Sequence, residues 1–244
     1  MRRKWWIWLT AALIMIVAAF VLWAGIAASP MPEAVWSLQS DELVVVREDP
    51  WLIFEPANGA ASLGLIIYPG GRVAPEAYAP LARAVAEEGY LSVIIPMPLN
   101  LAVLAPDSAE NVLAAFPDIE QWVIGGHSLG GAMAARFVDT HPEAIDGLVL
   151  LASYPAESQD LADQELGVLS IYGTNDGLAS VAEVEGAADK LPSTTVWVRV
   201  EGGNHAQFGW YGEQSGDLAA DITREEQGDV VLDAVLMFLA ALEE

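Results

Sequence analysis

The chain has 244 residues, no cysteine, and a formal net charge of −24 that arises from 34 acidic and 10 basic residues. A surface this acidic repels nucleic acid and anionic lipid headgroups, so we expect no nucleic-acid partner. The lack of cysteine excludes disulfides, and no histidine–cysteine cluster indicates a metal site. We therefore expect neither a metal nor an organic cofactor.

The N-terminal region has the composition of a membrane-spanning helix. Residues 5–28 hold no charge and are apolar apart from Thr10. At 1.5 Å per residue such a helix is about 36 Å long, enough for a hydrocarbon core of about 30 Å. Tryptophans fit the two membrane interfaces, three at one end and one at the other: Trp5, Trp6, Trp8 and Trp23. We predict that residues 1–30 form a membrane anchor and residues 31–244 form one folded domain.

Basic residues before this helix predict its orientation. Arg2, Arg3 and Lys4 favour a cytoplasmic N-terminus, which places the rest of the chain outside the cytoplasm. Removing these three charges from the net −24 leaves −27 on the remainder. The alternative is a cleavable signal peptide ending at the small residues 25–28, but the apolar stretch exceeds the usual length of about 7–15 residues. We predict an uncleaved, single-pass anchor with an extracytoplasmic domain.

Strand-like segments alternate with helical ones along the rest of the chain. We predict strands at residues 43–46, 51–54, 63–68, 91–95, 122–125, 147–151, 168–172 and 195–200. Helices are expected at residues 75–89, 131–138 and 224–242. This order predicts an α/β fold with a doubly wound, mostly parallel eight-stranded sheet, whose first hairpin is antiparallel. Residues 152–167 are too few for a lid, so we expect no cap domain and an open site.

The most specific motif is Gly-x-Ser-x-Gly, formed by Gly126, Ser128 and Gly130 between a predicted strand and a predicted helix. On a sharp strand-to-helix turn, called a nucleophile elbow, the serine hydroxyl is exposed and the backbone is strained. The two glycines leave room for that turn because they have no Cβ. The backbone N–H of Leu129 then points at an oxyanion formed on the serine. The motif therefore predicts a nucleophilic Ser128.

A serine hydroxyl needs a base, and the chain contains three histidines. His127 precedes Ser128, so its side chain is expected to point away from the hydroxyl, and His141 has the position of a helix-terminal surface residue. His205 follows a predicted strand and a Gly-Gly-Asn loop, which suits an imidazole held over the end of a neighbouring strand. We predict His205 as the base.

A carboxylate is expected to orient the imidazole and to stabilise its charged form. Asp176 comes directly after the predicted strand 168–172, at the edge where α/β folds place their chemistry. The alternative for Asp176 is an Asx turn beside Gly177, which is compatible with the same role. Other acids follow the preceding strand: Glu157, Asp160 and Asp163. We predict Asp176, which gives the chain order Ser128, Asp176, His205.

The oxyanion also requires a second N–H donor, from the loop after an earlier strand. Residues 69–73 follow the apolar strand 63–68, and the two glycines among them let the backbone approach a ligand closely. We assign the second donor to the N–H of Gly71, with Arg72 as the alternative. A plain tight turn would have the same sequence.

Together these motifs make the chain, from about Leu63 to its C-terminus, resemble an α/β-hydrolase. It is most similar to the small single-domain esterases and dienelactone hydrolases. Two features depart from these relatives: the nucleophile is Ser128, where dienelactone hydrolases have cysteine, and Pro69-Gly70 stands where many lipases have His-Gly. The resemblance implies an α/β-hydrolase fold and a reaction through an acyl-enzyme.

Substrate contacts are expected from two apolar segments near the predicted strand ends. Met97 and Asn100 lie in a segment that is either the wall of an acyl pocket or a short packed helix. Phe208, with Trp210 and Tyr211, follows His205 and forms either a pocket wall or core.

We predict a serine hydrolase of small carboxylic esters. The alternatives are an acyltransferase, amidase or thioesterase using the same triad, or a catalytically silent membrane-tethered binding module.

Overall fold

The computed structural model describes residues 5–59 and 61–243 and contains one eight-stranded sheet, in the order β1-β2-β4-β3-β5-β6-β7-β8. Its strands are β1 (Val44–Arg47), β2 (Leu52–Pro56), β3 (Leu63–Tyr68), β4 (Leu91–Ile94), β5 (Gln121–His127), β6 (Gly147–Leu151), β7 (Gly167–Gly173) and β8 (Val196–Val200). The pairs β1–β2 and β2–β4 are antiparallel, and every later pair is parallel. The predicted α/β-hydrolase sheet, with its antiparallel first hairpin, is confirmed.

Seven α-helices lie within the described residues. They are α1 (Trp5–Gly25), α2 (Pro32–Trp36), α3 (Ala79–Glu87), α4 (Ala109–Ala115), α5 (Leu129–Thr140), α6 (Val181–Gly186) and α7 (Arg224–Leu242). The predicted helix 75–89 is divided into a 3-10 turn, Pro75–Tyr78, and α3, because Pro80 at the start of α3 has no N–H to continue the earlier turn. Helix α7 has the predicted bounds, and its first turn is closed by a Thr223–Glu226 capping box.

Helices cover both faces of the sheet. Buried residues of α3 and α7 share one core cluster with Leu65 and Ile67 of β3. Buried residues of α4 and α5 share the other cluster with Ile66 and Tyr68 of the same strand. Successive side chains of a strand point to opposite faces, so a sheet covered on both faces needs apolar residues at every position. This requirement explains the unbroken apolar sequence of β3.

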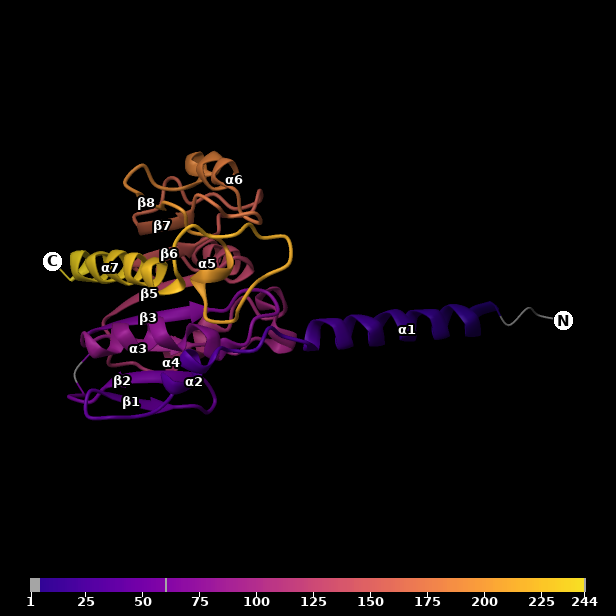
Figure 1. The fold of residues 1–244 in the computed structure, drawn as a ribbon, viewed down its shortest axis with the longest axis horizontal. Coiled ribbons are helices and arrows are strands. Elements are labelled where there is room, and N and C mark those ends of the chain that lie inside the picture. The colour runs from indigo at the N-terminus through magenta and orange to yellow at the C-terminus, as the bar shows by residue number, and fades with distance from the viewer. Residues whose placement is uncertain (1–4, 60, 244) are drawn as a thin grey trace.

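Helix α1 projects away from the domain, on the side where the loops after the parallel strands lie (Figure 1). It is 21 residues long with mean hydropathy 2.5, and only Ala24 within it is buried. One N-terminal helix is thus long and apolar enough to cross a membrane. The basic residues Arg2, Arg3 and Lys4, on which the predicted orientation depends, lie outside the described residues.

Residues 152–166 connect β6 to β7 without a helix or strand. This agrees with the prediction that the domain has no cap over the carboxyl edge of its sheet. The division of the chain at residue 30 stays a prediction; α2 begins two residues later, at Pro32.

The crossing of α5 over the end of β3 leaves no room for a side chain. A Cβ at Gly130 would overlap the carbonyl oxygens of Tyr68 and Pro69. A Cβ at Gly126 would lie 2.5 Å from the carbonyl carbon of Gly130. These two glycines therefore set the distance between the nucleophile turn and β3.

We expect Gly130→Ala to lower the free energy of unfolding by about 3 kcal/mol, because backbone must move to admit the methyl group. Gly186→Ala is the matched control, since a Cβ at Gly186 in α6 meets no atom within 4 Å. Equilibrium urea unfolding of the full chain in non-ionic detergent measures both. Equal stability of the two variants would contradict the close packing of α5 on β3.

Candidate active site

Ser128 lies on a strained turn between β5 and α5. Its φ of 53° and ψ of −122° are unusual for a residue with a side chain. Three hydrogen bonds hold the turn: the N–H of Ser128 donates to Leu151 O at 3.0 Å, and Ser128 O accepts from Ala132 N at 3.1 Å and Ser153 Oγ at 2.7 Å. Strain held in this way is typical of a nucleophile elbow and presents the serine hydroxyl outward.

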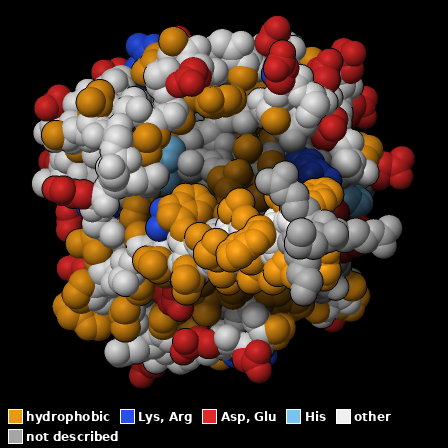
Figure 2. Space-filling model, turned by 90° about the vertical axis from the view of Figure 1, so that its right-hand side faces the viewer, with side chains coloured by type: hydrophobic (Ala, Val, Ile, Leu, Met, Phe, Trp, Pro, Cys, Tyr) orange, Lys and Arg blue, Asp and Glu red, His pale blue; other side chains and the backbone are white. Residues whose placement is uncertain are grey.

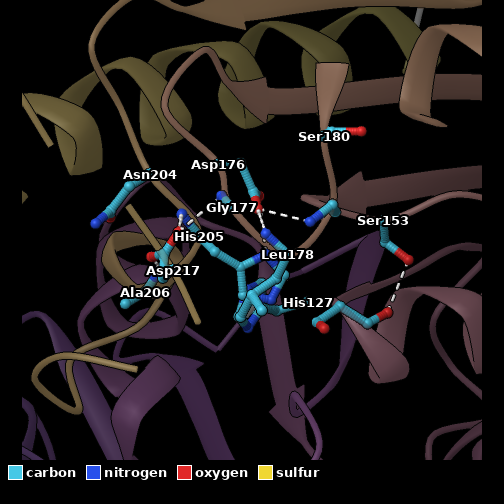
Figure 3. A network of polar contacts seen from close by, with 12 residues as sticks. His127, Ser153, Asp176, Gly177, Leu178, Ser180, Asn204, His205, Ala206 and Asp217 are labelled. Atoms are coloured by element: carbon cyan, nitrogen blue, oxygen red, sulfur yellow. Dashed lines mark hydrogen bonds and ion pairs between the residues drawn. The ribbon is translucent and has the colours of Figure 1, made fainter. Parts of the chain in front are cut away.

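Asp176 and His205 meet across the loops that follow β7 and β8. His205 Nδ1 lies 2.8 Å from Asp176 Oδ2, and both side chains are buried (Figure 3). The other carboxylate oxygen accepts the N–H groups of Leu178 at 2.8 Å and Ala179 at 2.6 Å. The turn expected from sequence and the contact with the imidazole are thus both present at one carboxylate.

The second ring nitrogen of His205 is buried and has no hydrogen-bond partner among the described residues. Because Asp176 occupies Nδ1, the proton is held there and the lone pair is left on Nε2. A general base needs this tautomer. No hydrogen bond joins Nε2 to the Ser128 hydroxyl in the described part of the chain, and such bonds in free enzymes are often long and tighten when substrate binds.

The His205 loop is held by two residues that sequence analysis did not identify. Asp217 accepts the N–H of Ala206 at 2.8 Å and the N–H of Gly177 at 3.0 Å, so one carboxylate joins the loops that carry His205 and Asp176. Arg224, in the first turn of α7, donates to the carbonyls of Ala206 at 2.6 Å and Gly212 at 2.9 Å. Neither residue belongs to a motif, and their distance along the chain from His205 gives no signal.

Two backbone N–H groups on neighbouring segments, those of Gly71 and Leu129, make no hydrogen bond within the described residues. In the loop after β3, the N–H of Gly70 donates to the Tyr78 hydroxyl at 2.9 Å, and the N–H of Arg72 donates to Asn100 O at 2.7 Å. Gly71 lies between them, and its N–H makes no hydrogen bond within the described residues; the same holds for Leu129. A Cβ on Gly71 would lie 3.1 Å from a methyl group of Leu129.

This geometry favours Gly71 over the alternative donor, Arg72. The amide of Arg72 is already committed to the carbonyl of Asn100, whereas the amide of Gly71 is available to a ligand. Two available amides on adjacent segments are what an oxyanion requires.

His127 lies between Tyr78, which bonds the Gly70 amide, and His205. Its Nδ1 is 2.9 Å from the Tyr78 hydroxyl, and its ring centroid is 4.5 Å from that of His205. Burial lowers the pKa of His127 well below its ordinary value, and the neighbouring His205 lowers it further. His127 is therefore neutral at pH 7 and adds no charge beside the base.

The three residues expected to contact substrate lie in different places. Met97 is buried and packs in the core cluster of α4 and α5. Phe208 is buried and stacks on the ring of His127, with centroids 5.9 Å apart. Asn100 is half-buried and meets the oxyanion loop through its backbone carbonyl. For Met97 and Phe208 the structure thus shows the packed alternative, and their substrate role stays a prediction.

No group of three metal-ligating side chains occurs in the part of the chain that the structure describes. The comparisons with known proteins agree with the fold. A family model described as "Alpha/beta hydrolase family" matches residues 64–229.

The chain belongs to the alpha/beta hydrolase family. This confirms the resemblance inferred from its motifs, and membership of the family supports a hydrolase. Among solved structures, it is similar to a predicted CIB-like hydrolase from Thermoplasma acidophilum, with a TM-score of 0.58 and 16% identity over 78% of this chain and 95% of that chain. At this identity the likeness shows the shared fold alone.

The low pKa of His127 predicts how stability depends on pH. Below about pH 6.5 the unfolded chain binds a proton at this position before the folded protein does, so stability falls as pH decreases. In wild type this effect lowers the free energy of unfolding by up to about 1.4 kcal/mol for each pH unit of acidification. We expect His127→Asn, which keeps a polar group toward Tyr78, to lack this contribution. Urea unfolding of both proteins between pH 7 and pH 5 measures the difference. Parallel stability curves would show that the folded protein protonates His127 normally.

Proposed function

We propose that the chain is a serine hydrolase that cleaves small carboxylic esters through an acyl-enzyme. The observation on which this depends is the buried Asp176–His205 pair, whose imidazole centroid lies 4.5 Å from that of His127, the residue before Ser128. The neighbouring amides of Gly71 and Leu129 support the same proposal, because each can donate to a developing oxyanion. The reaction needs no cofactor, and its expected partner is a small-molecule ester.

In the first half of the reaction, the Ser128 oxygen attacks the ester carbonyl carbon and its proton passes to Nε2 of His205. The carbonyl oxygen becomes an oxyanion that accepts hydrogen bonds from the N–H groups of Gly71 and Leu129. The bond to the alcohol oxygen then breaks, and His205 returns the proton to the leaving alcohol. Asp176 holds the imidazole and stabilises its positive charge throughout.

In the second half, a water molecule gives a proton to His205 and attacks the acyl carbon on Ser128. The resulting oxyanion collapses, the bond to the Ser128 oxygen breaks, and His205 returns the proton to the serine. The products are a carboxylic acid and an alcohol, and the enzyme regains its starting state.

We further propose that α1 anchors this domain to a membrane, with the N-terminus in the cytoplasm and the domain outside it. The length and hydropathy of α1 support the anchor. The basic residues Arg2, Arg3 and Lys4 support the orientation.

We expect a fluorophosphonate probe to label the full chain at Ser128, because only an activated serine reacts with it at a useful rate. Ser128→Ala should abolish labelling. Ser158→Ala is the control, since Ser158 is an exposed serine in the loop after β6 and lies outside the Ser128 turn. Labelling of Ser128→Ala, or of neither wild type nor control, would overturn the proposed nucleophile.

We expect Asp176→Asn to lower kcat for a soluble ester by about 10³–10⁴-fold, because the amide favours the wrong imidazole tautomer. Asp160→Asn is the control, since Asp160 follows the preceding strand and, within the described residues, its carboxylate accepts a single local N–H, from Ala162. That variant should stay within about twofold of wild type. A large loss with Asp160→Asn and none with Asp176→Asn would identify a different acid.

A further inference from the structure

The segment that leaves α1 is joined directly to the oxyanion loop. Ala28 forms a parallel bridge with Val73: its N–H donates to Arg72 O at 2.7 Å, and its carbonyl accepts from Ala74 N at 3.1 Å. Three residues on, the N–H of Met31 donates to Trp210 O at 2.8 Å, in the segment that follows His205. The connection between α1 and the domain is therefore short and hydrogen-bonded on both sides of the site.

Arg72 strengthens this junction through its side chain. Its guanidinium lies 4.3 Å from the ring centroid of Trp23 in α1 and donates to the carbonyl of Ile26 at 3.2 Å. Trp23 is within the last turn of α1, where a tryptophan suits a membrane interface. The loop that presents the N–H of Gly71 is thus fixed beside the point where α1 reaches the interface.

Exposed apolar side chains lie at the same edge of the sheet as this junction. They lie in α1's connecting segment and in loops after the carboxyl ends of β4, β7 and β8: Ile26, Val103, Leu104, Leu178 and Leu218. In the view toward the projecting helix, hydrophobic side chains gather around its base and acidic ones lie mainly at the periphery (Figure 2). A face of this kind, in a chain of net charge −24, suits contact with an apolar surface.

Helix α1 is about as long as a membrane is thick, so little chain separates this face from the membrane surface. Twenty-one residues of helix span about 31 Å, close to the hydrocarbon thickness of about 30 Å. When α1 crosses the bilayer, the carboxyl edge of the sheet, with Ser128 on it, faces the lipid headgroups directly.

We propose that the substrate is an acyl ester dissolved in the bilayer, which reaches Ser128 from the membrane side. This inference rests on the proposed esterase function and names its substrate class. The strongly acidic domain repels anionic headgroups, so the lipid phase that suits it is neutral or zwitterionic. The apolar side chains around the junction replace the lipid contacts that an acyl chain loses as it leaves the bilayer.

The experiment uses the full chain reconstituted in phosphatidylcholine vesicles. One substrate is 4-methylumbelliferyl oleate dissolved in the bilayer, and the other is p-nitrophenyl acetate in water. Each rate is divided by the amount of Ser128 that reacts with a fluorophosphonate probe. In the test variant, a Gly/Ser spacer of about ten residues is inserted between Gly25 and Ile26, which separates domain and membrane by about 18 Å. In the control variant, the same spacer follows Asn58, which is exposed at the opposite edge of the sheet.

We expect the spacer after Gly25 to lower the ratio of oleate to acetate rates at least about fivefold, because it removes proximity to the bilayer, whereas loss of the Trp23–Arg72 contact beside the Gly71 loop affects both rates alike. The spacer after Asn58 should change neither rate. A second pair of variants tests the apolar face: Leu104→Asp should lower the ratio of oleate to acetate rates, whereas Met237→Asp, exposed on α7, should not.

Unchanged ratios of oleate to acetate rates in both the Gly25 spacer and Leu104→Asp variants would overturn the bilayer as the source of substrate, while acetate hydrolysis would leave the esterase proposal intact. Absence of both hydrolysis and probe labelling in wild type would overturn the proposed function itself. The two failures are therefore distinguishable.

Discussion

The backbone of Ser128 is the constraint on which the rest of the site depends. A residue with a side chain at a φ of 53° costs on the order of 1–3 kcal/mol and persists only where its surroundings hold it. Here β6 supplies an acceptor for its N–H, and the first turn of α5 and Ser153 bond its carbonyl. Those contacts need α5 to lie against β3, which Gly126 and Gly130 permit. The packing of α5 against the sheet thus compensates for the backbone strain at Ser128.

The parallel sheet brings Asp176 and His205 to the same edge as Ser128. Because both side chains are buried, each needs the other as a hydrogen-bond partner. Asp176 has three donors: the amides of Leu178 and Ala179 and the imidazole of His205. A buried carboxylate without such partners is costly, as is a buried imidazolium without a carboxylate. The position of the His205 imidazole therefore depends on the loop after β7 as much as on its own loop, and Asp217 bonds both loops.

The sequence was sufficient to predict those structural features that depend on residues close together in the chain. Strand β3 was predicted with its observed bounds because a strand buried on both faces must be apolar throughout, and the elbow followed from two glycines around Ser128. The fold class and hydrolase family are confirmed, whereas the roles of the site residues stay predictions. Sequence could not identify Asp217 or Arg224, because their contacts join segments with no shared pattern. Nor could it separate a pocket wall from core at Met97 and Phe208, since both environments favour the same side chains.

Arg72 shows why the predicted oxyanion donor was ambiguous in sequence and why the hydrogen bonds of the fold favour Gly71. From its position alone, its N–H and that of Gly71 are equivalent. In the fold, its amide bonds Asn100, its carbonyl bonds Ala28, and its guanidinium contacts Trp23 and Ile26. These contacts hold it at a φ of 60°, which a side chain disfavours and a glycine would adopt freely. A glycine would keep the turn but lose the contact with α1, so the arginine links α1 to the loop that contains Gly71.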